Sequence, residues 1–127
     1  MDLLKNIYNI NENAANGEKS NTDDLTPEEV KELFNYDSKT GKLTWAVSRQ
    51  KIQKGSEAGN LDEDGYMRTR INGVLHYNHV LIYMLVTGKK IPEDKEIDHI
   101  NRIRHDNRLE NLRLATKSEN QKNKNSY

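Results

Sequence analysis

The stretch IDHINRIRHDNRLENLRLATKSEN, residues 97–120, decides the fold of the C-terminal part of the chain. The apolar pattern at its start predicts a short strand over residues 96–100, and a second strand is expected over 109–114. The sequence Thr116-Lys117-Ser118-Glu119 has the spacing of a capping box, which predicts a helix from Lys117 to about Lys124. The stretch therefore predicts a strand, a loop, a strand and a helix.

Four polar side chains in this arrangement are of types that bind metal ions or act in acid–base catalysis. Asp98 and His99 lie on the first strand, Asn111 follows His99 by twelve residues, and Asn120 follows nine residues later. Strands packed on the helix would bring these side chains together. Carboxylate and amide oxygens suit Mg²⁺ or Mn²⁺ rather than zinc. A neutral imidazole is a good general base, and an amide beside it can accept a ring N–H and fix the tautomer.

The same residues carry a family resemblance. The ordered groups Asp98-His99-Ile100-Asn101, Asp106-Asn107-Arg108, Glu110-Asn111-Leu112-Arg113 and Ser118-Glu119-Asn120 resemble the HNH endonuclease family. They are most similar to the branch of phage homing endonucleases in which Asn replaces the last His of the motif. Upstream, residues 25–45 and 65–88 resemble the segments that precede the nuclease motif in those proteins, so the resemblance covers about residues 25–124.

The resemblance implies a ββα-metal fold that holds one divalent metal ion, Mg²⁺ or Mn²⁺. Asp98 and Asn120 would be the metal ligands, His99 the general base, and Asn111 the residue that orients His99. Family members leave 5′-phosphate and 3′-hydroxyl ends. Two positions depart from the family pattern: Arg102 stands where relatives often have Gly, and Val80 stands where they often have Arg.

The upstream part predicts one helix, a sheet and a second helix. Thr26, Pro27 and Glu29 predict a helix that ends near Tyr36. Strands are expected over 42–48, 66–71 and 74–77, joined by turns that include the hairpin signal Asn72-Gly73. An apolar helix over 79–87, capped by Asn78, should end at Gly88. The expected fold class is α+β: a three-stranded antiparallel sheet with a helix, followed by a C-terminal ββα-metal motif.

The composition excludes disulfide-bonded, cysteine-zinc and membrane-spanning proteins. The chain has 127 residues and no cysteine, which excludes disulfides and structural zinc held by cysteine. No apolar run is long enough to span a bilayer, so no membrane association is expected. We expect a flexible acidic leader over 1–24, a helix-and-sheet part over 25–95 and the nuclease motif over 96–127, with 25–127 one compact domain. The resemblance implies a phage-encoded protein in the cytoplasm of a bacterial host.

The charge distribution points toward DNA as the partner. Residues 1–35 hold three bases and eight acids (3 − 8 = −5), whereas residues 36–127 hold seventeen bases and twelve acids (17 − 12 = +5). Basic side chains that are expected to contact phosphates, or otherwise to form a solubilising surface, are Arg68, Arg70, Arg102, Arg104, Arg108, Arg113, Lys117 and Lys122.

Other readings of these features stay open. The sheet element, 42–77, resembles sheets that read DNA in plant-type transcription factor domains, so a DNA-binding or regulatory module with little cleavage is an alternative. The acidic leader could mimic DNA or bind a partner, including a phage protein. A monomer should nick, whereas a double-strand cut needs two copies, for example a homodimer. His76, His79 and His105 are expected to be structural or solvated, and Asn101, Asn107 and Asn123 to shape turns and caps.

Overall fold

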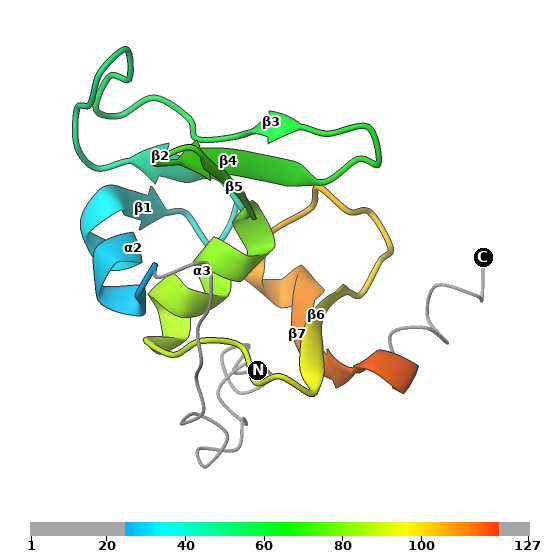
Figure 1. Cartoon of the computed structure of the whole chain (residues 1–127). Coiled ribbons are helices and arrows are strands. Elements are labelled where there is room, and N and C mark those ends of the chain that lie inside the picture. Colours follow the sequence, from blue (N-terminus) through cyan, green and yellow to red (C-terminus); the bar gives the residue numbers. More distant parts are fainter. Residues whose placement is uncertain (1–24, 120–127) are drawn as a thin grey trace.

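The computed structural model describes residues 25–119, which form an α+β fold of helices packed against short antiparallel sheets (Figure 1). The expected acidic leader, residues 1–24, and the expected metal ligand Asn120 lie outside the described residues. Within the described range, no helix has the length and apolar character that crossing a membrane requires.

The first described elements are helix α2, Pro27–Leu33, and strands β1, Phe34–Tyr36, and β2, Leu43–Trp45. The predicted capping box is confirmed: the Glu29 amide donates to the Thr26 hydroxyl, and the Thr26 amide donates to the Glu29 carboxylate. The expectation that this helix reaches Tyr36 was wrong. The helix ends at Leu33 because Phe34–Tyr36 pairs as a strand with β2, and the Phe34 and Trp45 rings lie 4.6 Å apart.

A three-stranded antiparallel sheet is present, but one of its strands differs from the prediction. It consists of β3, Asn60–Leu61, β4, Met67–Ile71, and β5, Val74–Tyr77, in the order β3-β4-β5. The expected strand over 42–48 pairs with β1 instead, and Asn60–Leu61 takes its place in the sheet. The predicted Asn72-Gly73 hairpin turn is confirmed, since both residues have positive φ.

Helix α3, Asn78–Thr87, crosses the centre of the molecule between the sheets (Figure 1). Leu81, Ile82 and Tyr83 are fully buried in its core face, and Gly88 ends the helix in the left-handed conformation, as predicted. Asn78 does not cap the helix as expected. Its buried amide instead donates to the Ala58 carbonyl and accepts from the Thr69 hydroxyl, which ties α3 to the sheet.

The C-terminal part forms a β-hairpin. Strand β6, Lys95–His99, pairs with β7, Leu112–Thr116, so that His99 lies opposite Leu112. A short 3-10 turn, η2, Leu109–Asn111, leads into β7, which therefore begins later than expected. The second predicted capping box is also confirmed, because Thr116 and Glu119 bond each other's backbone amides where the next helix begins. We refer to residues 95–116 as the β6–β7 hairpin.

Candidate active site

Polar side chains are buried together at the end of β6 and in the loop that follows it. Asp98 is 2%, His99 6%, Asn107 3% and Asn111 4% exposed. Buried polar groups are stable only when they are hydrogen-bonded, so each of these side chains needs a defined partner. The hairpin therefore holds a polar cluster whose geometry is set by its own hydrogen bonds.

The amide bonded to His99 is that of Asn107. The Asn107 Oδ1 atom lies 2.8 Å from Nε2 of His99. Asn107 was expected only to shape a turn, so this contact is an addition to the expected site, in which Asn111 was the residue that orients His99. Sequence spacing does not reveal the contact, since it depends on the path of the loop between the two residues.

Asn111 fixes the loop that carries Asn107. Its Oδ1 accepts the backbone N–H of Asn101 at 2.9 Å, and its Nδ2 donates to the carbonyl of Asp106 at 2.8 Å. These bonds join both ends of the loop between β6 and η2. Asn111 is thus placed one step away from His99, as a brace for the loop backbone.

An ion-pair network stiffens the same loop. Arg108 donates to both carboxylate oxygens of Asp106 at 2.8 Å and to Glu110 at 2.6 Å, while Asn101 donates to Asp106. The bidentate hydrogen bonds from Arg108 hold the pKa of Asp106 well below its ordinary value. Arg108 was expected to contact DNA, but its guanidinium is engaged with these two carboxylates.

Aromatic rings and a second imidazole surround His99. The His79 ring meets the His99 ring edge-on, with centroids 5.0 Å apart, and Tyr66 lies 6.1 Å from His99. Tyr77 stacks on His79 at 5.1 Å. Burial lowers the pKa of His99 and lowers that of His79 to about 3, so both rings are neutral at neutral pH. His79 was expected to be a satisfied core histidine, yet its buried Nδ1 has no hydrogen-bond partner among the described residues.

Asp98 provides a carboxylate beside His99. Its Oδ2 accepts from Nε of Arg113 at 2.8 Å, so Arg113, expected to contact DNA, also neutralises this buried charge. A buried carboxylate is a hard oxygen donor and fits a divalent cation of the Mg²⁺ type. The proposed second ligand, Asn120, lies outside the described residues. Within residues 25–119, no group of three or more His, Asp or Glu side chains gathers as a metal site.

The sheet presents a basic face that continues toward His99. Arg68 pairs with Tyr77 and Arg70 pairs with Leu75 across β4 and β5, so these four side chains share the face opposite the buried Thr69 and Ile71. Tyr66, at the His99 end of β4, lies under the guanidinium of Arg104 at 5.2 Å. The predicted alternation of Tyr66, Arg68 and Arg70 against the inner face is confirmed by this burial pattern. Of the remaining expected contacts, Arg102 and Lys117 are exposed, and Lys122 lies outside the described residues.

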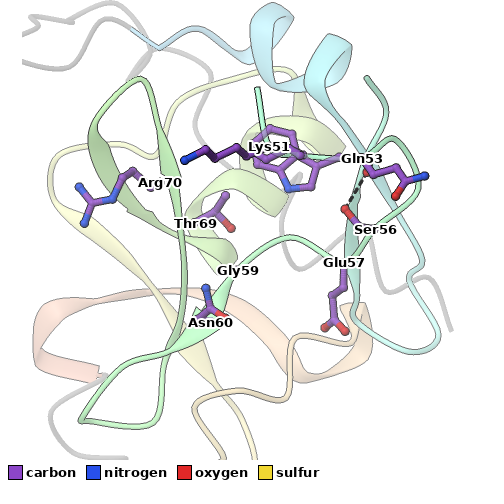
Figure 2. Close-up of a pocket in the computed structure, with 10 residues that line it drawn as sticks. Lys51, Gln53, Ser56, Glu57, Gly59, Asn60, Thr69 and Arg70 are labelled. Atoms are coloured by element: carbon purple, nitrogen blue, oxygen red, sulfur yellow. Dashed lines mark hydrogen bonds between the residues drawn. The ribbon is translucent and has the colours of Figure 1, made fainter. Parts of the chain in front are cut away.

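A hollow of about 450 Å³ lies between the segment over residues 51–60 and strand β4. Figure 2 shows that Lys51, Thr69, Arg70 and Glu57 are among its lining residues. Lys51 adds a cation close to the basic face and has an unusual positive φ of 63°. The lining residues do not include Asp98, His99 or Asn107, so the hollow is separate from the buried polar cluster.

Two comparisons with known proteins find similarities to this chain. Residues 76–122 match a family model described as HNH endonuclease. Among solved structures, the chain is similar to one titled "DNA binding and cleavage by the HNH homing endonuclease I-HmuI", with a TM-score of 0.54 and 23% identity. The match covers 73% of this chain and 52% of that chain, so this chain spans about half the length of that protein. A search of curated proteins finds no significant match.

Proposed function

We propose that this chain, in which residues 76–122 match the HNH endonuclease family model, hydrolyses phosphodiester bonds of DNA. The observation that carries the proposal is the buried cluster at the end of β6. There a neutral imidazole is fixed by an amide 2.8 Å away and stands next to a carboxylate in the sequence. This combination provides an oriented general base beside a hard oxygen donor.

His99 acts in this proposal as the general base. With the Asn107 oxygen assigned toward Nε2, the neutral ring carries its proton on Nε2 and has its lone pair on Nδ1. That lone pair takes the proton of the attacking water. Because burial lowers the pKa of His99, the ring is unprotonated and competent at neutral pH.

Asp98, together with Asn120, would hold the divalent cation, Mg²⁺ or Mn²⁺. When bound, the cation supplies electrostatic stabilisation to the scissile phosphate and the departing oxygen. Arg113 holds the Asp98 carboxylate in place through its 2.8 Å bond. The expected products carry 5′-phosphate and 3′-hydroxyl ends.

DNA is proposed to lie across the basic face of the sheet and reach His99 at its end. Arg68 and Arg70 supply contacts to phosphates, while Arg104 and Tyr66 lie between the sheet and His99. Such contacts position the duplex without reading its sequence. They explain how a chain of zero net charge can still bind DNA, because the bases are concentrated on residues 36–127.

Cleavage of supercoiled plasmid tests the proposal. Wild type and His99→Ala are incubated with Mg²⁺, Mn²⁺ or EDTA, and the forms are separated on a gel. We expect metal-dependent conversion to open circle by wild type alone, which indicates a nicking monomer. Direct conversion to linear DNA would indicate two copies acting together. If the two proteins behave identically with either metal, the proposed activity is wrong.

A DNA-binding module that cuts little is the second candidate. The exposed side chains of Arg70, Leu75 and Tyr77 favour it, because they form a binding face that does not need the β6–β7 hairpin. The same experiment separates the two functions when it is paired with a binding assay. Salt-dependent binding without any cleavage would assign the chain to this second function.

A further inference from the structure

The loop that carries Asn107 is attached to the N-terminal β1–β2 hairpin, far away in the sequence. The Tyr36 hydroxyl donates to the Asn107 carbonyl at 2.6 Å, and the Leu109 amide donates to the Ser38 carbonyl at 3.1 Å. Tyr36 and Ser38 precede the segment that matches the HNH family model, residues 76–122. Strand β1 and the turn that follows it therefore bond the loop on both sides of Arg108.

The same turn also fits closely against the loop backbone. A Cβ atom placed on Gly41 would lie 2.6 Å from the Asn107 carbonyl carbon and 2.6 Å from the Arg108 nitrogen. These distances are far below van der Waals contact, so only glycine lets the two backbones approach this closely. The turn thus packs directly against the Asn107–Arg108 peptide, in addition to the two hydrogen bonds described above.

Asn107 connects the β1–β2 hairpin to the imidazole of His99. Its backbone carbonyl is held by Tyr36 while its side-chain oxygen faces His99 Nε2 at 2.8 Å. A displacement of the Asn107 backbone would therefore move the oxygen that faces Nε2 of His99 and favours the tautomer protonated there. Burial raises the pKa of Tyr36, which keeps the phenol protonated and able to donate at any physiological pH.

We propose that Asn107 is a positioning residue for His99 and that the β1–β2 hairpin, through Tyr36, holds Asn107 in place. The N-terminal hairpin is thereby part of the active site, although no residue of it touches the reacting atoms. The inference rests on the proposed function, because positioning matters only if His99 acts on DNA. The structural part, the tautomer of His99, can be tested without cleavage.

The first experiment measures that tautomer directly. Long-range ¹H–¹⁵N spectra of the free protein distinguish a histidine protonated on Nε2 from one protonated on Nδ1, and a His99→Gln variant identifies the His99 signals. We expect the Nε2–H form in wild type and a mixture of forms in Asn107→Leu, which removes the acceptor at similar size. An unchanged His99 spectrum in Asn107→Leu would overturn the inference.

The second experiment measures single-turnover cleavage and DNA affinity separately. We expect the cleavage rate to fall about tenfold or more in Asn107→Leu and about threefold to tenfold in Tyr36→Phe, as partial losses of general-base catalysis. DNA affinity should stay within about twofold, because neither side chain lies on the proposed basic face. Equal falls in rate and affinity in both variants would show a merely structural role and would overturn the inference.

Two controls keep the outcomes distinct. Tyr83→Phe removes a buried hydroxyl that has no hydrogen-bond partner within residues 25–119, so it should change neither the rate nor the His99 spectrum. Tyr36→Phe deletes one atom and keeps the ring, so it decides the question if Asn107→Leu does not fold. If wild type and His99→Ala are equally inactive, the proposed function fails, and the spectra still decide whether Asn107 and Tyr36 position His99.

Discussion

The β6–β7 hairpin and the three-stranded sheet both present polar side chains, but they hold them in opposite ways. In the hairpin, Asp98, His99 and Asn107 are nearly inaccessible to solvent. Asp98 bonds Arg113, and Asn107 bonds His99. On the sheet, Arg70 is exposed and bonds only a turn carbonyl among its described hydrogen bonds.

This difference is consistent with the role proposed for each region. A general base must keep one orientation, and a buried, satisfied hydrogen-bond network provides that because the alternatives leave polar groups unpaired. A surface that binds phosphates does not need one fixed orientation of its side chains. Mobile, hydrated cations suffice there, because they bind DNA by displacing the counterions of its phosphates. Changes in the hairpin should therefore affect the cleavage rate, whereas changes on the sheet should affect affinity.

Replacing the proposed base should have the largest effect. His99→Ala removes the imidazole from the buried cluster, and we expect cleavage to fall by about 100-fold or more, since general-base catalysis contributes on the order of 10²–10⁴. DNA affinity should be retained because the sheet is untouched. The matched control is His105→Ala, an exposed histidine of the same loop. Single-turnover kinetics on supercoiled DNA provide the measurement, and full activity of His99→Ala would remove the distinction between the two regions.

A glycine that faces the loop of the β6–β7 hairpin and a glycine of the sheet offer the next test. Gly41 and Gly73 have nearly the same backbone angle, φ 82° and 86°, but a Cβ on Gly41 meets the hairpin loop, whereas a Cβ on Gly73 meets nothing within 4 Å. Both alanine variants carry the cost of a left-handed residue, about 1–2 kcal/mol. We expect only Gly41→Ala to slow cleavage as well, by about tenfold, because it displaces the Asn107 peptide.

Urea unfolding and cleavage rates of both glycine variants separate strain from displacement. Gly41→Ala should lose more stability than Gly73→Ala, because its Cβ also clashes with the loop backbone, and it alone should slow cleavage. If Gly73→Ala slows cleavage to the same extent, strain in the backbone explains the slower rate wherever it is introduced. The contact between Gly41 and the hairpin loop would then have no specific effect on cleavage.

Local signals in the sequence predicted much of the fold. Both capping boxes, the Asn72-Gly73 turn and the end of α3 at Gly88 were predicted correctly, because each depends on side chains within four residues of one another. The errors occurred where long-range pairing overrides local preference. Phe34–Tyr36 continues a helical pattern, yet it is a strand because it pairs with β2. Strand β3 has only two residues, which is too short for a recognisable strand pattern in the sequence.

The candidate site residues could be selected from the sequence, but their contacts could not. The neighbours Asp98 and His99 follow from the order of residues in one hairpin, and the structure buries both. The pairing of His99 with Asn107, and of Asn107 with Tyr36, depends on how the loop folds back and on a turn 71 residues away in the chain. No residue pattern signals a hydrogen bond to a backbone carbonyl, so Tyr36 could not have been selected.

Acid should destabilise the protein through the buried imidazoles near the hairpin. Burial lowers the pKa of His79 from 6.5 to about 3, so the unfolded chain binds a proton that the folded chain does not. Stability is therefore complete above pH 6.5 and falls as the pH drops toward 3, by about 1.4 kcal/mol per pH unit for one histidine. Between pH 7 and 5, His79→Gln should lose about 2 kcal/mol less than wild type in urea unfolding.

The exposed histidine of the hairpin loop is the control for this pH effect. His105→Gln replaces an exposed histidine of that loop and is the control for the substitution itself. If His79→Gln and wild type lose stability in parallel, the His79 ring is accessible to protons in the folded protein, and the contrast between a closed hairpin and an open sheet weakens.

Removing single cations from the sheet should have the smallest effect, and an effect of a different kind. We expect Arg70→Ala to weaken DNA binding severalfold and to reduce the slope of log K against log salt by about 1, as the loss of one phosphate contact does. Arg68→Ala should do less, because Arg68 already lies 3.3 Å from Asp62 and its charge is partly compensated. Lys90→Ala, which removes an exposed cation three residues after the end of α3, is the matched control. The cleavage rate at saturating DNA should not change in any of these variants, and a slower rate for Arg70→Ala at saturation would mean that the sheet also orients the reacting phosphate.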